Sequence, residues 1–234
     1  QVELRTIPPD NPHIWEEARF KGRDTRPIIH WGIQSAMRAG PLATPGRYSV
    51  RMTAGGQAYT RSLEVLGDPK ISASASDLVA STATQIRIRD DMNKAVAMIN
   101  RLELMRKQIE DLVKANAGKK MVEQALRDLD QKMMDVELQL LSRTDLHSDD
   151  KWYVEAYKVY MNLIWLNGVI GTGASDVAGG ANYRPTDASL QALEMLEKEL
   201  AAAEAGFTAL VDKEVPAFNR AHAGRKIAIK TGAM

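Results

Sequence analysis

The stretch RYSVRMTAGGQAYTRSLEV, residues 47–65, decides how the first part of the chain folds. Tyr48, Val50 and Met52 alternate with polar residues, which is the period of a half-buried β-strand. Ala54-Gly55-Gly56 then offers a turn in which glycine adopts positive φ without steric cost. Because residues 58–65 alternate in the same way, the stretch predicts a β-hairpin with one apolar face.

Proline positions divide the chain just after this hairpin. Seven of the nine prolines precede residue 70, at positions 8, 9, 12, 27, 41, 45 and 69. Proline breaks helices and removes a backbone donor, so residues 1–70 are predicted to be a β-rich, Ig-like part with Pro- and Gly-rich loops. From Ser72 onward, long stretches lack both proline and glycine. The sequence thus predicts a boundary near Asp68-Pro69 and a helical bundle over residues 71–234.

The β part is predicted to be incomplete. Besides the hairpin, strands are expected at residues 2–7 and 27–31, which makes about four strands where an Ig-like sandwich has about seven. A sheet of so few strands with a bare apolar face is marginally stable by itself. The missing surface must therefore come from the helices, from chain upstream of Gln1, or from another protein.

After the boundary, apolar residues recur every three or four positions through several helical segments. The first of these, residues 76–115, would span roughly 60 Å as a helix. Asn116-Ala117-Gly118 ends it, and so short a connection makes the next helix antiparallel. We expect an antiparallel four-helix bundle, with a plain coiled coil as the alternative, and an α+β fold class overall. The other helices are predicted over residues 119–142, 151–166 and 185–215.

Composition excludes several classes of function. The 31 Lys and Arg residues against 30 Asp and Glu give a net charge of +1, so no overall field favours nucleic acid as a partner. The absence of cysteine excludes disulfide scaffolds, thiolate zinc sites and cysteine nucleophiles. The most apolar window, residues 153–170, contains Glu155 and Lys158, so no transmembrane segment is expected. No signal sequence follows Gln1, and we expect the chain to be processed, trimmed or part of something longer.

No motif predicts a catalytic, cofactor-binding or metal-binding residue. The Gly-rich connector over residues 168–180 lacks the Lys-Ser/Thr of a phosphate loop and follows a helix, so a flexible connector is favoured. His147 lies among acidic residues that are better explained by a helix start at Ser148-Asp149-Asp150 than by a metal site. The basic C-terminal tail from Arg220 is more typical of a frayed, solvated end than of a phosphate site.

Aromatic residues mark the surfaces that we expect to contact a partner. Tyr153, Tyr157 and Tyr160 share one face of the third helix at i, i+4 and i+7, and amphipathic aromatic side chains are favoured at interfaces. Core packing explains the same pattern equally well. The residues predicted to bind a partner are Trp15, Trp31, Tyr48, Tyr153, Tyr157 and Trp165.

The order of several motifs resembles a known family. Residues 40–52, GPLATPGRYSVRM, followed by Asp68-Pro69-Lys70, look like a hairpin and its exit in the C-terminal region of large bacterial proteins. Those proteins carry sortilin-like, BNR-repeat (sialidase-type) propellers and are often labelled glycosyl hydrolases. Residues 184–186, RPT, and 215–219, VPAFN, also match, so the resemblance covers most of the chain. The hairpin pattern by itself recurs in many bacterial Ig-like modules.

The resemblance implies export to the periplasm or cell surface. Any catalytic residue would lie in a propeller, and the chain lacks the S-x-D-x-G-x-T-W Asp box of propeller blades, so no catalytic residue is carried over. We expect a non-enzymatic structural or protein–protein interaction module that scaffolds a larger extracytoplasmic complex, including one peripheral to a membrane. No cofactor is expected, and the expected partner is a protein that completes the β part. The alternative is the accessory C-terminal part of a secreted propeller-type hydrolase acting on glycans or peptides.

Overall fold

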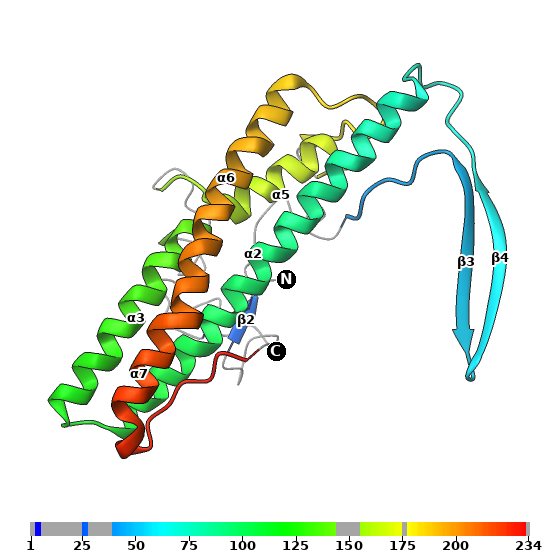
Figure 1. The fold of residues 1–234 in the computed structure, drawn as a ribbon. Helices are drawn as coiled ribbons and strands as arrows, with labels where there is room; N and C mark the ends of the chain where they lie inside the picture. The colour runs from blue at the N-terminus through cyan, green and yellow to red at the C-terminus, as the bar shows by residue number, and fades with distance from the viewer. Residues whose placement is uncertain (1–2, 6–24, 28–38, 144–154, 175–176, 233–234) are drawn as a thin grey trace. The chain divides into compact units, whose positions relative to one another are not determined.

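The structure is a computed structural model that describes residues 3–5, 25–27, 39–143, 155–174 and 177–232 (Figure 1). It is mostly helical and contains small antiparallel sheets of two strands each. At this level the predicted combination of a small β part and a long helical part is confirmed. The helical elements are α2 (Ala75–Ala115), α3 (Lys120–Leu140), α5 (Val159–Ile170), α6 (Asp187–Ala209), the π-helical turn η2 (Leu210–Glu214), α7 (Val215–His222) and the 3-10 turn η3 (Ala223–Arg225).

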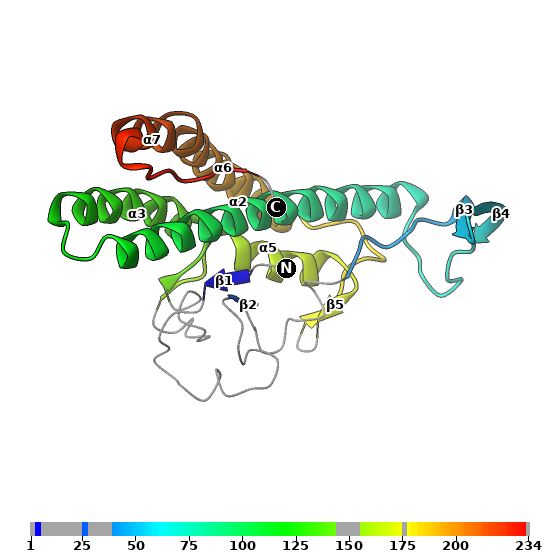
Figure 2. The same ribbon diagram turned by 90° about the horizontal axis from the view of Figure 1, so that it is seen from below.

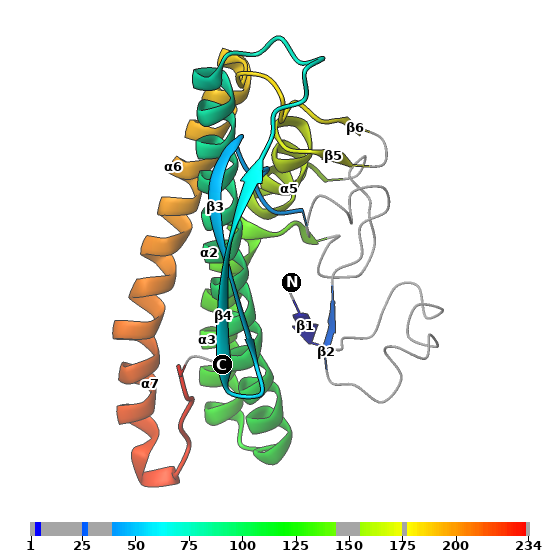
Figure 3. The ribbon, with the colours of Figure 1, turned by 90° about the vertical axis from the view of Figure 1, so that its right-hand side faces the viewer.

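The predicted hairpin is confirmed, with every residue of one strand paired to the other. Strands β3 (Gly46–Ala54) and β4 (Gln57–Val65) form an antiparallel ribbon in which Tyr48 faces Leu63 and Met52 faces Tyr59 (Figure 3). The turn residues Gly55 and Gly56 have φ of 56° and 77°. Positive φ at both central residues is the requirement of a two-residue turn that matches the strand twist, and glycine meets it without strain.

The other described strands do not enlarge this sheet. Strands β1 (Glu3–Arg5) and β2 (Thr25–Pro27) pair with each other, and so do β5 (Gly173–Ala174) and β6 (Val177–Ala178). The strands predicted over residues 2–7 and 27–31 match β1 and β2 only in part, and residues 28–31 lie outside the described residues. No described strand pairs with an outer edge of the hairpin.

Contacts divide the chain into two compact units, each built from segments that are distant in sequence. The helical unit comprises residues 1–31, 91–164 and 193–234, and the hairpin unit comprises residues 32–90 and 165–192. Helices α2, α5 and α6 contribute residues to both units. None of the helices in the described part of the chain combines the length and apolar character needed to cross a membrane.

Helix α2 begins and ends where local signals predict. Ser74 and Asp77 form a reciprocal cap at its start: the Ser74 N–H donates to Asp77 Oδ2 at 3.1 Å, and the Asp77 N–H donates to Ser74 Oγ at 3.2 Å. The Ser74 hydroxyl also donates to Asp77 Oδ2, at 2.6 Å, and this bond together with the one from the Ser74 N–H lowers the pKa of Asp77. At the other end, Gly118 has φ of 87° and turns the chain into α3.

The core of the helical unit is formed by α2 after residue 90, by α3, and by α6 with its continuation (Figures 1 and 2). Gly206 of α6 allows close approach to α3, because a Cβ there would lie 3.2 Å from Val136 Cγ2. Arg101 of α2 lies over the Phe207 ring of α6, 4.9 Å from its centroid. The buried apolar residues of α2 and α3 include Met98, Ile99, Leu102, Met105, Ile109, Val122, Leu126, Leu129, Met133 and Leu140.

The last helix continues beyond Val215, where the sequence predicted its end. Helix α6 passes through η2 into α7, and Pro216 lies in the first turn of α7. In a regular α-helix proline clashes with the carbonyl four residues earlier. The wider π-helical turn changes that spacing, and the chain therefore remains helical to His222.

Helix α5 begins at Val159, later than the predicted residue 151. Residues 144–154, which include the predicted helix start at 148–150, lie outside the described residues. Residues 155–158 are not helical. The Arg143 N–H donates to the Glu155 carboxylate at 2.8 Å, which holds this segment beside the end of α3 in place of a helical turn.

The described residues of the Gly-rich connector are folded, whereas the sequence predicted a flexible segment. Strands β5 and β6 pair, and the Gly180 N–H donates to the Val169 carbonyl at 2.9 Å. A Cβ at Gly179 would lie 2.3 Å from the backbone nitrogen of Gly173. Glycine is required here because the chain passes so close to itself.

The C-terminal tail is also ordered, and the predicted frayed end is wrong. The Asn219 amide holds Ile229: Nδ2 donates to the Ile229 carbonyl at 2.9 Å, and Oδ1 accepts the Ile229 N–H at 2.8 Å. The Gln108 amide holds Lys230 in the same way, at 3.1 Å and 2.9 Å. Residues 226–232, which we name the C-terminal strap, therefore tie α7 to α2.

Gln108→Ala removes both hydrogen bonds to Lys230, each with a net worth of about 0.5–1.5 kcal/mol. We expect the free energy of unfolding to fall by about 1–3 kcal/mol, measured by urea denaturation. The matched control is Gln131→Ala, because that exposed amide bonds to Asp135 within the same helix. The control should change the free energy by less than about 0.5 kcal/mol. An equal loss in both variants would show that the strap adds nothing to stability.

Candidate functional site

The β3–β4 hairpin exposes one apolar face. Residues directly opposite in an antiparallel pair lie on the same face, so the register places the apolar members of both strands together. Their side chains are between 37% and 57% exposed, whereas core residues of the same size are below 10%. The residues of this apolar face are Tyr48, Val50, Met52, Tyr59 and Leu63.

The other face of the hairpin is polar. Arg47 faces Glu64, Ser49 faces Ser62, and Arg51 faces Thr60. A ribbon with one polar and one apolar face is the form of a strand pair that packs against another layer. The hairpin is therefore amphipathic, and its apolar face is uncovered by the described residues of its own unit.

The chain entering the hairpin is fixed to helices of the hairpin unit. The Leu42 N–H donates to Gln85 Oε1 at 2.9 Å, and Thr82 Oγ1 donates to the Leu42 carbonyl at 2.8 Å. Asn167 of α5 donates from Nδ2 to the Ala39 carbonyl at 3.4 Å. Gln85 is itself buried and also donates to Ser81 Oγ within α2. The hairpin is thus held at its root, although the described residues of its unit leave its apolar face uncovered.

A second feature of the root is the hydroxyl of Tyr48. It donates to the carbonyl of Thr44, four residues upstream, at 2.6 Å, and lies 3.1 Å from the Thr44 hydroxyl. A tyrosine near the start of a strand that bonds back to the preceding backbone is the arrangement of a tyrosine corner, which is common in Greek-key sandwiches. The bond fixes the angle at which β3 leaves the root.

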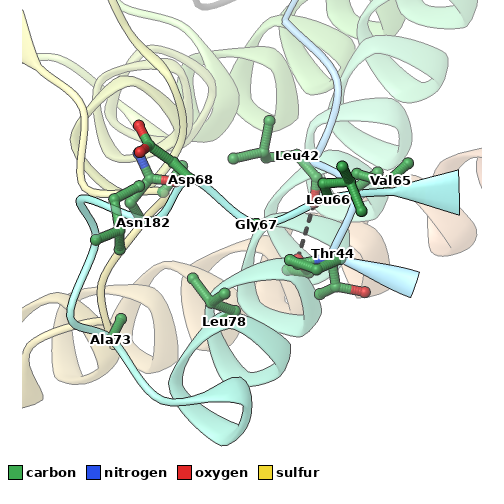
Figure 4. A pocket seen from close by; sticks show the side chains of 14 residues that line it. Leu42, Thr44, Val65, Leu66, Gly67, Asp68, Ala73, Leu78 and Asn182 are labelled. Carbon is green, nitrogen blue, oxygen red and sulfur yellow. Dashed lines mark hydrogen bonds between the residues drawn. The ribbon is translucent and has the colours of Figure 1, made fainter.

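A pocket of about 410 Å³ lies at the root, between the ends of the hairpin strands and the start of α2 (Figure 4). Leu42, Val65 and Leu78 give it an apolar lining, with Asp68 and Asn182 at its edge. Val65 belongs to the same face of the hairpin as Leu63. The apolar face is therefore continuous with this pocket.

The residues that the sequence predicts to bind a partner are spread over the molecule. Tyr48 lies on the apolar face of the hairpin, and Trp165 is half-buried in α5 of the same unit. Tyr157 lines a groove of about 400 Å³ in the helical unit, together with residues of α3 and α6. Trp15, Trp31 and Tyr153 lie outside the described residues. Their role in binding stays a prediction.

The predicted tyrosine face of the third helix is wrong. Tyr157 precedes α5, and its carbonyl accepts a hydrogen bond from Asn162 Nδ2 at 3.0 Å. Tyr160 is in the helix but is only 2% exposed. Because the helix begins between these two residues, they do not share a helical face. The late start of α5 is the physical reason for the difference.

The sequence analysis missed a buried charge cluster between α2 and α3. Arg106 forms ion pairs with Glu137, with Asp130 at 2.9 Å and with Glu103 at 3.7 Å. The side chains of Arg106 and Glu137 are 2% and 0% exposed. A signal was present in the sequence, since Glu137 falls on the apolar stripe of α3 beside Val136 and Leu140.

The electrostatics of this cluster follow from burial. Burial raises the pKa of Glu137 well above its usual range, and the nearby charge of Glu103 raises it further, although Arg106 opposes both. Burial lowers the pKa of Arg106, but the charges of Glu137 and Asp130 outweigh it, and the net shift is upward. With no exposed surface on Glu137, a substrate has no access to its carboxyl. Through its ion pairs with Glu137 and Asp130, Arg106 of α2 is joined to α3.

The described residues were compared with the requirements of metal sites, and the whole chain was compared with known proteins. Among the described residues, no group of three or more His, Asp or Glu side chains could hold a metal ion. No protein-family model, curated protein or solved structure matches this chain.

Glu137→Gln tests the buried cluster, because glutamine imitates the protonated acid. The folded-state pKa of Glu137 is raised, so the stability linked to its proton is complete below pH 4.5 and is lost as pH rises through the raised pKa. We expect the variant to lose less stability than the native protein between pH 5 and about 9. The measurement is urea denaturation across that range.

The control is Glu110→Gln, which changes a half-buried acid of α2 that pairs with Lys107 and Lys114. This control should leave the pH dependence of the free energy of unfolding as it is in the native protein. If Glu137→Gln also leaves it unchanged, the Glu137 proton is not linked to folding.

Gln85→Met removes the acceptor of the Leu42 N–H while keeping the length of the side chain. Leaving the Leu42 N–H without its acceptor costs about 1–3 kcal/mol, which corresponds to an increase of about 5- to 150-fold in local opening. We expect hydrogen exchange of the Leu42 amide to accelerate by that factor. Gln124→Met, on the exposed face of α3, should leave the rate unchanged. Unchanged exchange in Gln85→Met would show that the root is held by other contacts.

Proposed function

We propose that this chain is a non-catalytic interaction module that docks to a protein partner through the apolar face of its hairpin. The observation that carries the proposal is the exposure of Tyr48, Val50, Met52, Tyr59 and Leu63 on one side of a two-stranded ribbon. A contiguous apolar surface with this exposure is unfavourable in water and marks an interaction site. An isolated hairpin is also marginally stable, so a partner would stabilise both strands.

The anchored root supports this role. Hydrogen bonds from Gln85 and Thr82 to Leu42, and from Tyr48 to Thr44, determine where the hairpin begins and the direction in which it leaves. A surface that is oriented before binding loses less conformational entropy on docking. The root pocket, which continues the apolar face, would take a side chain of the partner.

We further propose that the hairpin is Ig-like and that the helical part is a four-helix bundle. The tyrosine corner and the amphipathic register favour the Ig-like assignment. The helical unit would then act as a rigid scaffold in a larger extracytoplasmic complex, as the family resemblance implies. Its buried Arg106 cluster and its C-terminal strap contribute to that rigidity.

The test is the native mass of the protein isolated from its source. The face variant carries Val50→Thr, Met52→Thr and Tyr59→Thr, which remove apolar surface while keeping strand propensity. The control variant changes the polar face, with Ser49→Ala, Thr53→Ala and Thr60→Ala. We expect the native protein and the control to migrate in a complex of fixed stoichiometry.

The face variant should instead migrate as the free chain of 25.8 kDa, with its helical circular dichroism unchanged. A native protein that is itself free at 25.8 kDa would refute the proposed function. So would a face variant that remains in the complex.

A further inference from the structure

The apolar face of the hairpin carries a cation at its centre. Arg61 faces Val50 across the ribbon, with the Tyr48–Leu63 pair on one side and the Met52–Tyr59 pair on the other. Its Nη1 donates to the carbonyl of Thr60 at 3.1 Å, and among the described residues no carboxylate is paired with it. A layer that covers this face would bury Arg61. Burying a charge is costly unless an opposite charge accompanies it.

The hairpin as a whole is positively charged. Residues 46–65 contain three arginines, at positions 47, 51 and 61, and one acid, Glu64, which gives a net charge of +2. Glu64 lies on the polar face opposite Arg47, so it does not reach the face that carries Arg61. Two copies of the hairpin packed face to face would bring like charges together. The charge therefore disfavours a second copy of this chain and favours an acidic occupant.

The backbone indicates what kind of element covers the face. Both β3 and β4 have an outer edge, and no described strand pairs with either of them. Unpaired strand edges accept a further strand through main-chain hydrogen bonds. The tyrosine corner made by Tyr48 and Thr44 belongs to sandwiches, in which a second sheet covers the first. A β-sheet partner meets these requirements with different strands, one paired with an edge of the hairpin and others packed on its apolar face, whereas a helix would leave the edges unpaired.

We infer that the hairpin is completed by the β-sheet of a different polypeptide, whose docking face is apolar and presents a carboxylate opposite Arg61. This inference rests on the proposed function and specifies the partner. Apolar side chains of that sheet pack on Tyr48, Val50, Met52 and Tyr59, and its Asp or Glu pairs with the guanidinium. The ion pair determines the register of docking, because a shift along the strands would bury Arg61 without a partner.

The experiment uses crosslinking in the source of the protein. The photoreactive amino acid p-benzoylphenylalanine replaces Tyr59 on the apolar face, and in a control it replaces Thr60 on the polar face. Two further variants are made in the Tyr59 background. Arg61→Glu reverses the charge on the apolar face, and Arg51→Glu makes the same change on the polar face. The crosslinked peptide is then identified by mass spectrometry.

We expect a crosslink from position 59 to a β-strand of another polypeptide, with Asp or Glu on the crosslinked face. Reversing one member of a buried charge pair brings two like charges together, so Arg61→Glu should lower the yield by about tenfold or more. Arg51→Glu should change the yield by less than about twofold. Arg61→Lys, which keeps the charge, should retain most of the crosslink.

The outcomes separate this inference from the proposed function. A crosslink that survives Arg61→Glu, or one to a helix or to a basic strand, overturns the inference and leaves an interaction module with another partner. A crosslink to a second copy, or within one chain, also overturns it. If position 59 yields no more crosslink than position 60, the proposed function fails as well.

Discussion

The position of the hairpin depends on two hydrogen bonds made by the backbone of Leu42. Gln85 accepts its N–H and Thr82 donates to its carbonyl, so one helix satisfies both polar groups of an extended residue. Backbone groups that leave water need such partners, and an extended segment outside a sheet has no ladder to supply them. The C-terminal strap meets the same constraint with the amides of Asn219 and Gln108. In both units, helix side chains thus hold extended chain in place.

Because the hairpin is anchored at its root, its exposed apolar face has a fixed orientation. A loosely attached hairpin with exposed Val50 and Met52 would be an aggregation hazard. A hairpin held at its root, with the Tyr48 hydroxyl bonded to Thr44, presents the same residues in one orientation. Arg61 in the middle of the face then adds selectivity, because an apolar surface without an acid would have to bury an unpaired charge. In the proposed interaction, affinity and specificity would therefore come from the same few side chains.

In the helical unit, a buried ion-pair cluster joins α2 to α3. Its most perturbed acid, Glu137, is sealed between α2 and α3 and pairs with Arg106. A buried ion pair adds little net stability, but it disfavours other alignments of the two helices, since they would leave a charge unpaired. The sequence analysis regarded α3 as an apolar stripe and missed this acid within it. It also missed the strap, because four basic residues suggested a solvated end.

Local patterns in the sequence determined the hairpin and the long helices. Alternation from Tyr48 to Met52, the glycines of the turn, and Gly118 at the end of the first long helix act over a few residues, so a single chain reveals them. Only the tertiary structure decided which distant groups meet: Leu42 with Gln85, Lys230 with Gln108, Arg106 with Glu137. A hydrogen bond or an ion pair depends on separation in space, and separation along the chain does not specify it.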